Sequence, residues 1–85
     1  MPTVTVRYWA AAKQAAGVAE DLVSAATLAD VLAEIRSRHG TAEFEAVLAR
    51  SSFLLDGAQV GARPPAEVGL PGQAVIEVLP PFAGG

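Results

Sequence analysis

Hydrophobic and polar residues change their spacing several times along the chain, and each spacing predicts a different element. Apolar residues alternate with polar ones from Val4 to Tyr8, which predicts a half-buried strand over residues 2–9. The helix-compatible stretch Ala10–Ala16 is followed by a glycine and predicts a short helix. Residues Glu20–Ser24 then predict a second strand, antiparallel to the first because the connection is short.

The clearest helix begins at Thr27. Apolar residues recur from Leu28 to Ile35 at helical spacing, which gives one apolar stripe for packing against a sheet. Thr27 is a good N-cap, and Asp30 suits a capping box at the positive end of the helix. We expect Gly40 to end this helix.

The second half of the chain predicts shorter elements. Thr41 is a good N-cap for another short helix. Residues Ser52–Leu55 predict a strand, and the Asp-Gly pair at 56–57 predicts a tight turn into a short strand near 59–60. Residues 74–79 predict a closing strand, which Pro-Pro ends because proline cannot donate to a ladder.

This order of elements favours an α+β layer fold. Two antiparallel strands, one main helix across the sheet and a closing strand beside the first strand describe a β-grasp, the ubiquitin architecture. We therefore expect one β-grasp domain with a mixed sheet over residues 1–79, followed by a flexible tail over residues 80–85.

Composition excludes several classes of function. The 85 residues carry a formal net charge of −3 with no cluster of lysine and arginine, so we expect no nucleic-acid partner. No long apolar run and no signal-like segment is present, so we expect a soluble cytoplasmic protein without a membrane partner. The chain has no cysteine, which excludes catalysis or sulfur transport by a side-chain thiol.

Side-chain catalysis is not expected. His39 is the only histidine, and we interpret it as a solvated charge partner at the end of a helix. Glu43 and Glu45 read as first-turn charges of the short helix, and Trp9 as a core or strand-end aromatic. We expect no metal site, no bound cofactor and no enzyme activity of the chain on its own.

The segment Pro80-Pro81-Phe82-Ala83-Gly84-Gly85 is the most informative part of the sequence. Glycine contributes no side chain to packing and loses the most freedom when ordered, so this tail has no use in the core. We expect Gly85 to be the chain end. Its carboxylate is sterically open, so the tail can enter a narrow slot of a partner enzyme and be activated there.

Three segments carry a resemblance to a known family. They are VTVRYWA at 4–10, TLADVL at 27–32 and VIEVLPPFAGG at 75–85. The chain resembles the small, sulfur-carrying subunit of molybdopterin synthase, within the ubiquitin-like sulfur carriers. It departs from that pattern at Gly72-Gln73, Phe82 and Arg63-Pro64-Pro65, which bears on the identity of the partner more than on the chemistry.

The resemblance implies a mechanism centred on Gly85. An E1-like enzyme would adenylate this residue with ATP, and a sulfur-donor protein would convert it to a thiocarboxylate. Gly84 and Ala83 would thread the active site of the large synthase subunit, which transfers the sulfur to the cyclic pyranopterin precursor. The resemblance also implies a heterotetramer of the two subunits.

Partner binding is expected from the tail and from the strand before it. The alternation in 74–79 points Val75 and Leu79 away from the helix, beside the exit of the tail. Phe82 is the best candidate anchor in a partner pocket, because it is a large aromatic on an otherwise bare segment. Pro81 and Pro80 favour an extended exit.

Two other functions use the same tail. A related sulfur carrier could serve thiazole or cysteine synthesis instead, although thiazole-pathway carriers usually lack the Pro-Pro pair. A ubiquitin-like modifier conjugated to lysines is the other alternative. The single lysine, Lys13, argues against self-linked chains through several sites.

Overall fold

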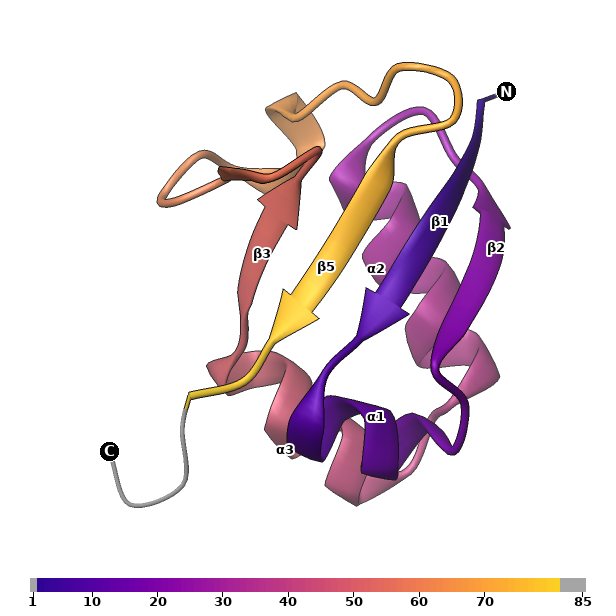
Figure 1. Cartoon of the computed structure of the whole chain (residues 1–85), viewed down its shortest axis with the longest axis vertical. Coiled ribbons are helices and arrows are strands. Elements are labelled where there is room, and N and C mark those ends of the chain that lie inside the picture. Colours follow the sequence, from indigo (N-terminus) through magenta and orange to yellow (C-terminus); the bar gives the residue numbers. More distant parts are fainter. Residues whose placement is uncertain (1, 82–85) are drawn as a thin grey trace.

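The computed structural model describes residues 2–81 of the chain. They form a five-stranded mixed sheet in the order β2-β1-β5-β3-β4, with β1 and β5 parallel and the other neighbours antiparallel (Figure 1). The α+β β-grasp fold predicted from the sequence is confirmed. The elements are β1 (Thr3–Tyr8), α1 (Ala10–Ala16), β2 (Glu20–Ser24), α2 (Leu28–Arg38), α3 (Ala42–Arg50), β3 (Ser52–Leu55), β4 (Ala58–Gln59), a 3-10 turn (Pro65–Glu67) and β5 (Val75–Leu79).

Helix α2 crosses one face of the sheet (Figure 1), and its buried residues are Leu28, Val31, Leu32 and Ile35. Thr27 caps it as predicted, because its Oγ1 accepts a hydrogen bond of 3.2 Å from the backbone N–H of Asp30. The apolar stripe of α2 is buried against the inward side chains of the central strands. The fully buried members of this core include Val4, Val6, Val23, Leu28, Val31, Ile35, Ile76 and Val78.

The end of α2 differs from the sequence prediction. The helix ends at Arg38 with His39 as its C-cap, and Gly40 does not have the left-handed φ of a glycine cap. Glycine is needed at this position for a different reason. A Cβ on Gly40 would lie 2.9 Å from the carbonyl oxygen of Arg36, so any other residue would collide with the last turn of the helix.

Helices α1 and α3 pack against each other at the end of the sheet where β1 and β5 both finish (Figure 1). Thr41 Oγ1 accepts a hydrogen bond of 3.0 Å from the N–H of Phe44 and so caps α3 as predicted. Gly17 ends α1 in the left-handed conformation, with φ of 78°. The β1–α1 turn and the exit of β5 therefore lie at the same edge of the molecule.

The predicted Asp-Gly hairpin is also present. Asp56 and Gly57 have φ values of 49° and 86°, which is the pattern of a type I′ turn between β3 and β4. Asp56 Oδ1 accepts a hydrogen bond of 2.9 Å from the N–H of Val75. The turn is thereby attached to the start of β5.

The sheet has one face covered by α2 and one outer face without a helix among residues 2–81 (Figure 1). Ile76 and Val78 point into the core, whereas Val75 and Leu79 are only partly buried. The predicted orientation of the closing strand is correct. No helix in the described part of the chain is long and apolar enough to span a membrane.

Candidate functional site: the outer sheet face and the tail exit

The predicted site residues divide between the sheet and the tail. Val75 and Leu79 lie on β5, and Pro80 and Pro81 follow it directly. The last four predicted site residues, Phe82, Ala83, Gly84 and Gly85, lie outside the described residues. The structure therefore describes the strand and the two prolines that lead into the tail, and the other four predicted site residues stay a prediction.

The outer face is defined by the outward side chains of four neighbouring strands. Strand register puts Thr5 beside Val75 and places Ser52 opposite Leu79 at the exit of β5. Leu22 lies opposite Thr5 on β2 and is 64% exposed. We use the name outer face for the set Glu20, Leu22, Thr5, Arg7, Val75, Glu77, Leu79, Ser52 and Leu54.

Trp9 stands at the edge of the outer face. Its side chain is 45% exposed, and its indole Nε1 donates a hydrogen bond of 2.9 Å to Glu77 Oε2 on β5. The strand-end part of the prediction for Trp9 is correct, and the core part is wrong. Thr3, Thr5 and Arg7 point outward at every second position of β1, and the same alternation puts residue 9 on the outer side. This pattern could have predicted that the indole lies over the outer face.

The backbone around Trp9 is fixed at several points. Its N–H donates to the carbonyl of Val78 at 3.2 Å, and its carbonyl accepts from the N–H groups of Ala12 and Lys13 at 2.9 and 3.3 Å. The next residue, Ala10, has φ of 48°, a conformation that costs an alanine energy. Such strain persists only where the surrounding structure imposes it, and here it directs the chain sharply from β1 into α1.

Charged groups alternate across the outer face. Arg7 lies between Glu20 on β2 and Glu77 on β5 in the strand register. Arg7 Nε is 3.4 Å from Glu20 Oε2, and both side chains are about half exposed. Exposed ion pairs of this kind contribute about 0–1 kcal/mol to stability, so their main effect is on the surface potential.

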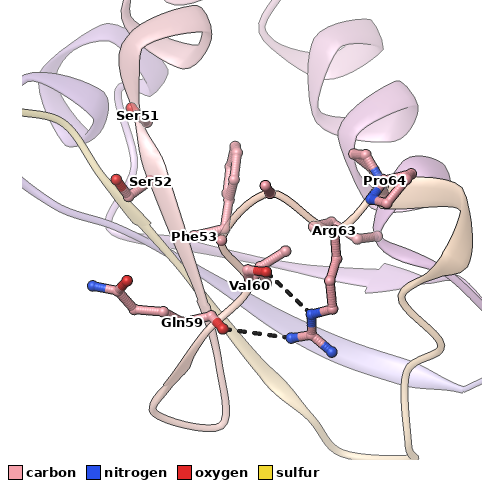
Figure 2. A pocket seen from close by; sticks show the side chains of 11 residues that line it. Ser51, Ser52, Phe53, Gln59, Val60, Arg63 and Pro64 are labelled. Atoms are coloured by element: carbon pink, nitrogen blue, oxygen red, sulfur yellow. Dashed lines mark hydrogen bonds between the residues drawn. The ribbon is translucent and has the colours of Figure 1, made fainter.

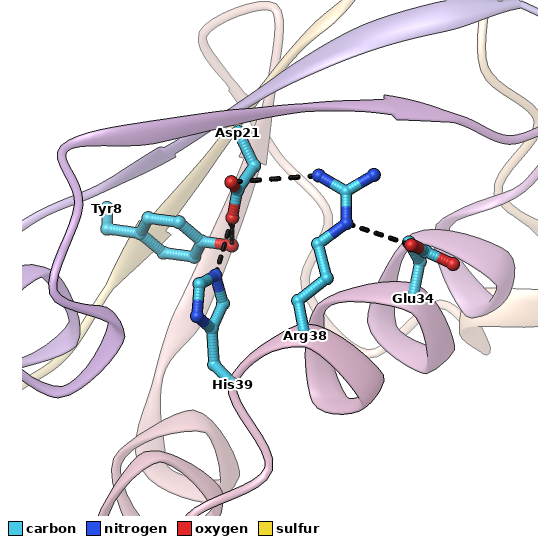
Figure 3. Close-up of polar contacts among 5 residues, drawn as sticks. All are labelled: Tyr8, Asp21, Glu34, Arg38 and His39. Carbon is cyan, nitrogen blue, oxygen red and sulfur yellow. Dashed lines mark hydrogen bonds and ion pairs between the residues drawn. The ribbon is translucent and has the colours of Figure 1, made fainter.

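A polar network lies under the end of β1, on the inner side of the sheet (Figure 3). Tyr8 donates a hydrogen bond of 2.8 Å to Asp21 Oδ2, and His39 Nε2 lies 2.6 Å from the same oxygen. Arg38 NH1 is 3.6 Å from the other carboxylate oxygen, and its Nε contacts Glu34 at 2.8 Å. The network joins β1 and β2 to the last turn of α2.

This network corrects the sequence interpretation of His39 as a solvated residue. Its side chain is only 14% exposed, and its ring meets those of Tyr8 and Phe44 at centroid distances of 5.7 and 5.3 Å. The partner Asp21 is 18 positions away on an edge strand, so no local sequence pattern predicts the contact. The role of His39 is to fasten the end of α2 to the sheet.

The network shifts the pKa values of Tyr8 and Asp21, and the hydrogen bond to Glu34 raises the pKa of Arg38. Burial first, and then the hydrogen bond to Asp21, raises the pKa of the Tyr8 hydroxyl. For Asp21, burial acts to raise the pKa, but the hydrogen bonds from His39 and Tyr8 and the nearby positive charges outweigh it and lower the pKa. Asp21 is therefore held as a carboxylate that accepts from its neighbours.

We expect Asp21→Asn to lower the free energy of unfolding at neutral pH by about 1–3 kcal/mol, because the neutral amide is a weaker acceptor for partly buried donors. A lowered folded pKa stabilises the protein above the unfolded value of about 3.9, and this contribution is lost as pH falls through the folded pKa. The difference between Asp21→Asn and wild type should therefore shrink in acid. Urea unfolding at neutral and acidic pH measures it, with exposed Glu67→Gln as control. An equal difference at both pH values would contradict the prediction.

A separate hollow of about 600 Å³ opens beside β3 and the loop after β4 (Figure 2). Phe53 and Val60 form part of its wall. The Arg63 guanidinium lies at its mouth but donates to the carbonyls of Val60 and Gln59, at 3.1 and 3.5 Å. Arg63 therefore shapes the loop. Of the predicted site residues that the structure describes, Val75, Leu79, Pro80 and Pro81, none lines this hollow.

Residues 2–81 hold no group of three or more His, Asp or Glu side chains that could bind a metal ion. The outer face instead offers an apolar surface with alternating charges next to the exit of β5. That arrangement is suited to contact with another macromolecule.

Comparisons with solved structures give the same fold. No protein-family model and no curated protein matches the chain. The chain is similar to a protein described as molybdopterin converting factor subunit 1 of Pyrococcus furiosus, with 26% identity and a TM-score of 0.79 over 96% of this chain and 100% of that one. Small archaeal modifier protein 1 of Methanosarcina acetivorans gives 23% identity and a TM-score of 0.83, over 100% and 98% of the two chains.

A third structure contains a partner. The complex of subunits 1 and 2 of the molybdopterin-converting factor from Helicobacter pylori matches with 20% identity and a TM-score of 0.72, over 98% of this chain and 99% of that one. The high TM-scores establish the shared fold. The low sequence identities leave open which of these relatives the chain resembles in function. The chain thus shares its β-grasp fold, over nearly its full length, with molybdopterin converting factor small subunits and small archaeal modifier proteins.

Proposed function

We propose that this chain is a ubiquitin-like sulfur carrier that bears its sulfur on the carboxyl group of Gly85. The observation that carries the proposal is a Pro-Pro-Phe-Ala-Gly-Gly segment directly after β5, the central strand of a β-grasp domain. The chain has no cysteine, so a main-chain carboxyl group is the place left for a transferable sulfur.

The proposed chemistry begins with an activating enzyme. The Gly85 carboxylate attacks the α-phosphate of ATP, pyrophosphate leaves, and an acyl adenylate forms. Sulfide then attacks the acyl carbon and displaces AMP, which leaves a thiocarboxylate. When a donor protein supplies a persulfide, the first product is an acyl disulfide, and a thiol must cleave it to release the same thiocarboxylate.

The body of the protein presents this group at a distance. Six tail residues at roughly 3.3 Å each span about 20 Å, which is enough to reach a buried active site. Pro80 and Pro81 restrict the start of the tail and reduce the entropy lost when a partner orders it. The carrier supplies reach and a reactive sulfur, and the partner supplies the catalytic groups.

The acceptor that we favour is the large subunit of molybdopterin synthase, which would add the sulfur to the cyclic pyranopterin precursor within a heterotetramer of the two subunits. The similarity to the Pyrococcus furiosus protein and to the Helicobacter pylori two-subunit complex supports this choice. The Pro-Pro pair at the start of the tail supports it over a thiazole-pathway carrier. Cysteine synthesis is the alternative pathway that uses the same chemistry.

A ubiquitin-like protein modifier is the second candidate function. The Methanosarcina acetivorans modifier protein matches this chain over 98% of its own length, with a TM-score of 0.83. A modifier uses the same adenylate but passes Gly85 to a lysine amine, which forms an isopeptide bond. The two functions therefore differ in the acceptor and share the activating enzyme.

Affinity capture from the source cells separates these functions. The tagged protein should retain an E1-like adenylating enzyme and the large subunit of molybdopterin synthase. Capture of a thiazole synthase or a cysteine synthase homologue would instead indicate that the carrier supplies sulfur for thiazole or cysteine synthesis. Ladders of covalent conjugates on many proteins would favour the modifier.

The proposal predicts a role for Phe82 in binding the large subunit. Phe82→Ala should weaken that complex by about 2 kcal/mol, or about thirtyfold in affinity, because an aromatic anchor is lost from the inserted tail. The melting temperature should stay nearly constant, since Phe82 follows the two prolines that come after the closing strand and we expect no internal cavity from its truncation. Calorimetric titration and a thermal melt measure the two effects. Unchanged affinity, or a melt lowered as far as that of a core variant, would contradict this role.

A further inference from the structure

Trp9 is partly exposed and is hydrogen-bonded through both its backbone and its side chain. Nearly half of its surface is exposed, yet backbone hydrogen bonds fix its N–H and carbonyl, and Glu77 Oε2 accepts from its indole. A side chain that is already ordered loses little conformational entropy when a partner covers it. Tryptophan is also enriched among the residues that dominate binding energy.

Glu77 lies beside Arg7 in the strand register but forms no ion pair within residues 2–81. Arg7 instead forms its ion pair with Glu20, at 3.4 Å. Within residues 2–81, Glu77 has no basic group within 4.0 Å. Its Oε2 accepts the indole N–H, and a carboxylate has lone pairs for further donors.

We propose that Trp9 and Glu77 form one recognition unit on the outer face, which receives an apolar pocket and a lysine or arginine of the adenylating enzyme. Glu77 holds the indole in the free protein and pairs with the partner's cation in the complex. This inference rests on the proposed function, because it takes the adenylating enzyme as the partner. Both the carrier and the modifier need that enzyme, so the inference does not depend on the final acceptor.

The location of the unit supports this choice of partner. Glu77 is on β5, two residues before Leu79 and the exit of the tail. An enzyme that adenylates Gly85 must hold both the tail and the body next to it. Charge pairing beside an apolar anchor gives such a complex its orientation and its rate of association.

Two substitutions separate the roles of Glu77. Glu77→Gln keeps an acceptor for the indole but removes the charge, so it should leave Trp9 fluorescence unchanged and weaken binding to the adenylating enzyme about tenfold. The salt dependence of binding should also become flatter. Glu77→Ala removes both functions, so it should shift the emission of Trp9, the only tryptophan, and weaken binding further.

The measurements are calorimetric titration against the adenylating enzyme at two salt concentrations, emission spectra of the free variants and thermal melts. Glu67→Gln, which removes one exposed acid from the 3-10 turn, is the charge-matched control and should bind as wild type. Equal affinity of Glu77→Gln and Glu67→Gln would overturn the cation-binding role. Unchanged emission in Glu77→Ala would overturn the indole contact. Failure of the wild-type protein itself to bind would overturn the proposed function, and this inference with it.

Discussion

Deletion of Gly85, or addition of one residue after it, should abolish thiocarboxylate formation and leave the thermal melt nearly unchanged. The reason is geometric, because the terminal carboxylate must reach the α-phosphate of the bound nucleotide and a displacement of about 1 Å can cost about a hundredfold in rate. The melt should hold because glycine has no side chain to contribute to the core. Mass spectrometry after incubation with the adenylating enzyme, ATP and a sulfur source measures the first effect.

A Gly85→Ala variant is the matched control, since it keeps the length of the tail and adds one methyl group. It should retain part of the activity, because the carboxylate stays at its position while the slot becomes crowded. Full activity of the shortened tail would contradict the carrier mechanism. A melt lowered by the deletion as far as by a core substitution would show that the tail is structural.

Substitution of Ile35 by alanine should have the opposite effects. Ile35 is fully buried between α2 and the sheet, so the smaller side chain leaves a cavity that costs about 2–5 kcal/mol. A domain of this size has a total stability of roughly 4–13 kcal/mol, so the variant should lose a large fraction of its stability and melt at a clearly lower temperature. Chemical denaturation monitored by circular dichroism gives the change in the free energy of unfolding.

Leu22→Ala is the control for that experiment. Leu22 is 64% exposed on the outer face, so its truncation creates no internal cavity and should change stability by about 0.5 kcal/mol or less. Equal losses in the two variants would mean that the outer face contributes to the core as much as α2 does. The account of the two sheet faces would then be wrong.

Elements with local signals were predictable from the sequence. The alternation in β1 and β5 and the helical spacing after Thr27 repeat within a few residues, so they also assigned Val75 and Leu79 to the outer face correctly. The Asp-Gly turn was predictable because its left-handed backbone selects for those residues. These signals depend on the neighbours of each residue along the chain.

Contacts between distant segments were not predictable in the same way. The His39–Asp21 contact and the Trp9–Glu77 hydrogen bond join residues 18 and 68 positions apart, and both depend on how the strands and helices pack. The sequence did not show why glycine is needed at position 40. The reason is the short distance to the Arg36 carbonyl oxygen, and that distance exists only once the end of the helix has folded. The tail residues 82–85 stay a prediction from the sequence.

The most direct test of the central claim is the intact mass of the wild-type protein after incubation with its adenylating enzyme, ATP and a sulfur source. The carrier mechanism predicts a gain equal to one sulfur minus one oxygen, located by fragmentation on the C-terminal peptide that ends at Gly85. The gain should disappear when ATP is left out. An unchanged mass in the presence of an active adenylating enzyme would contradict the carrier function.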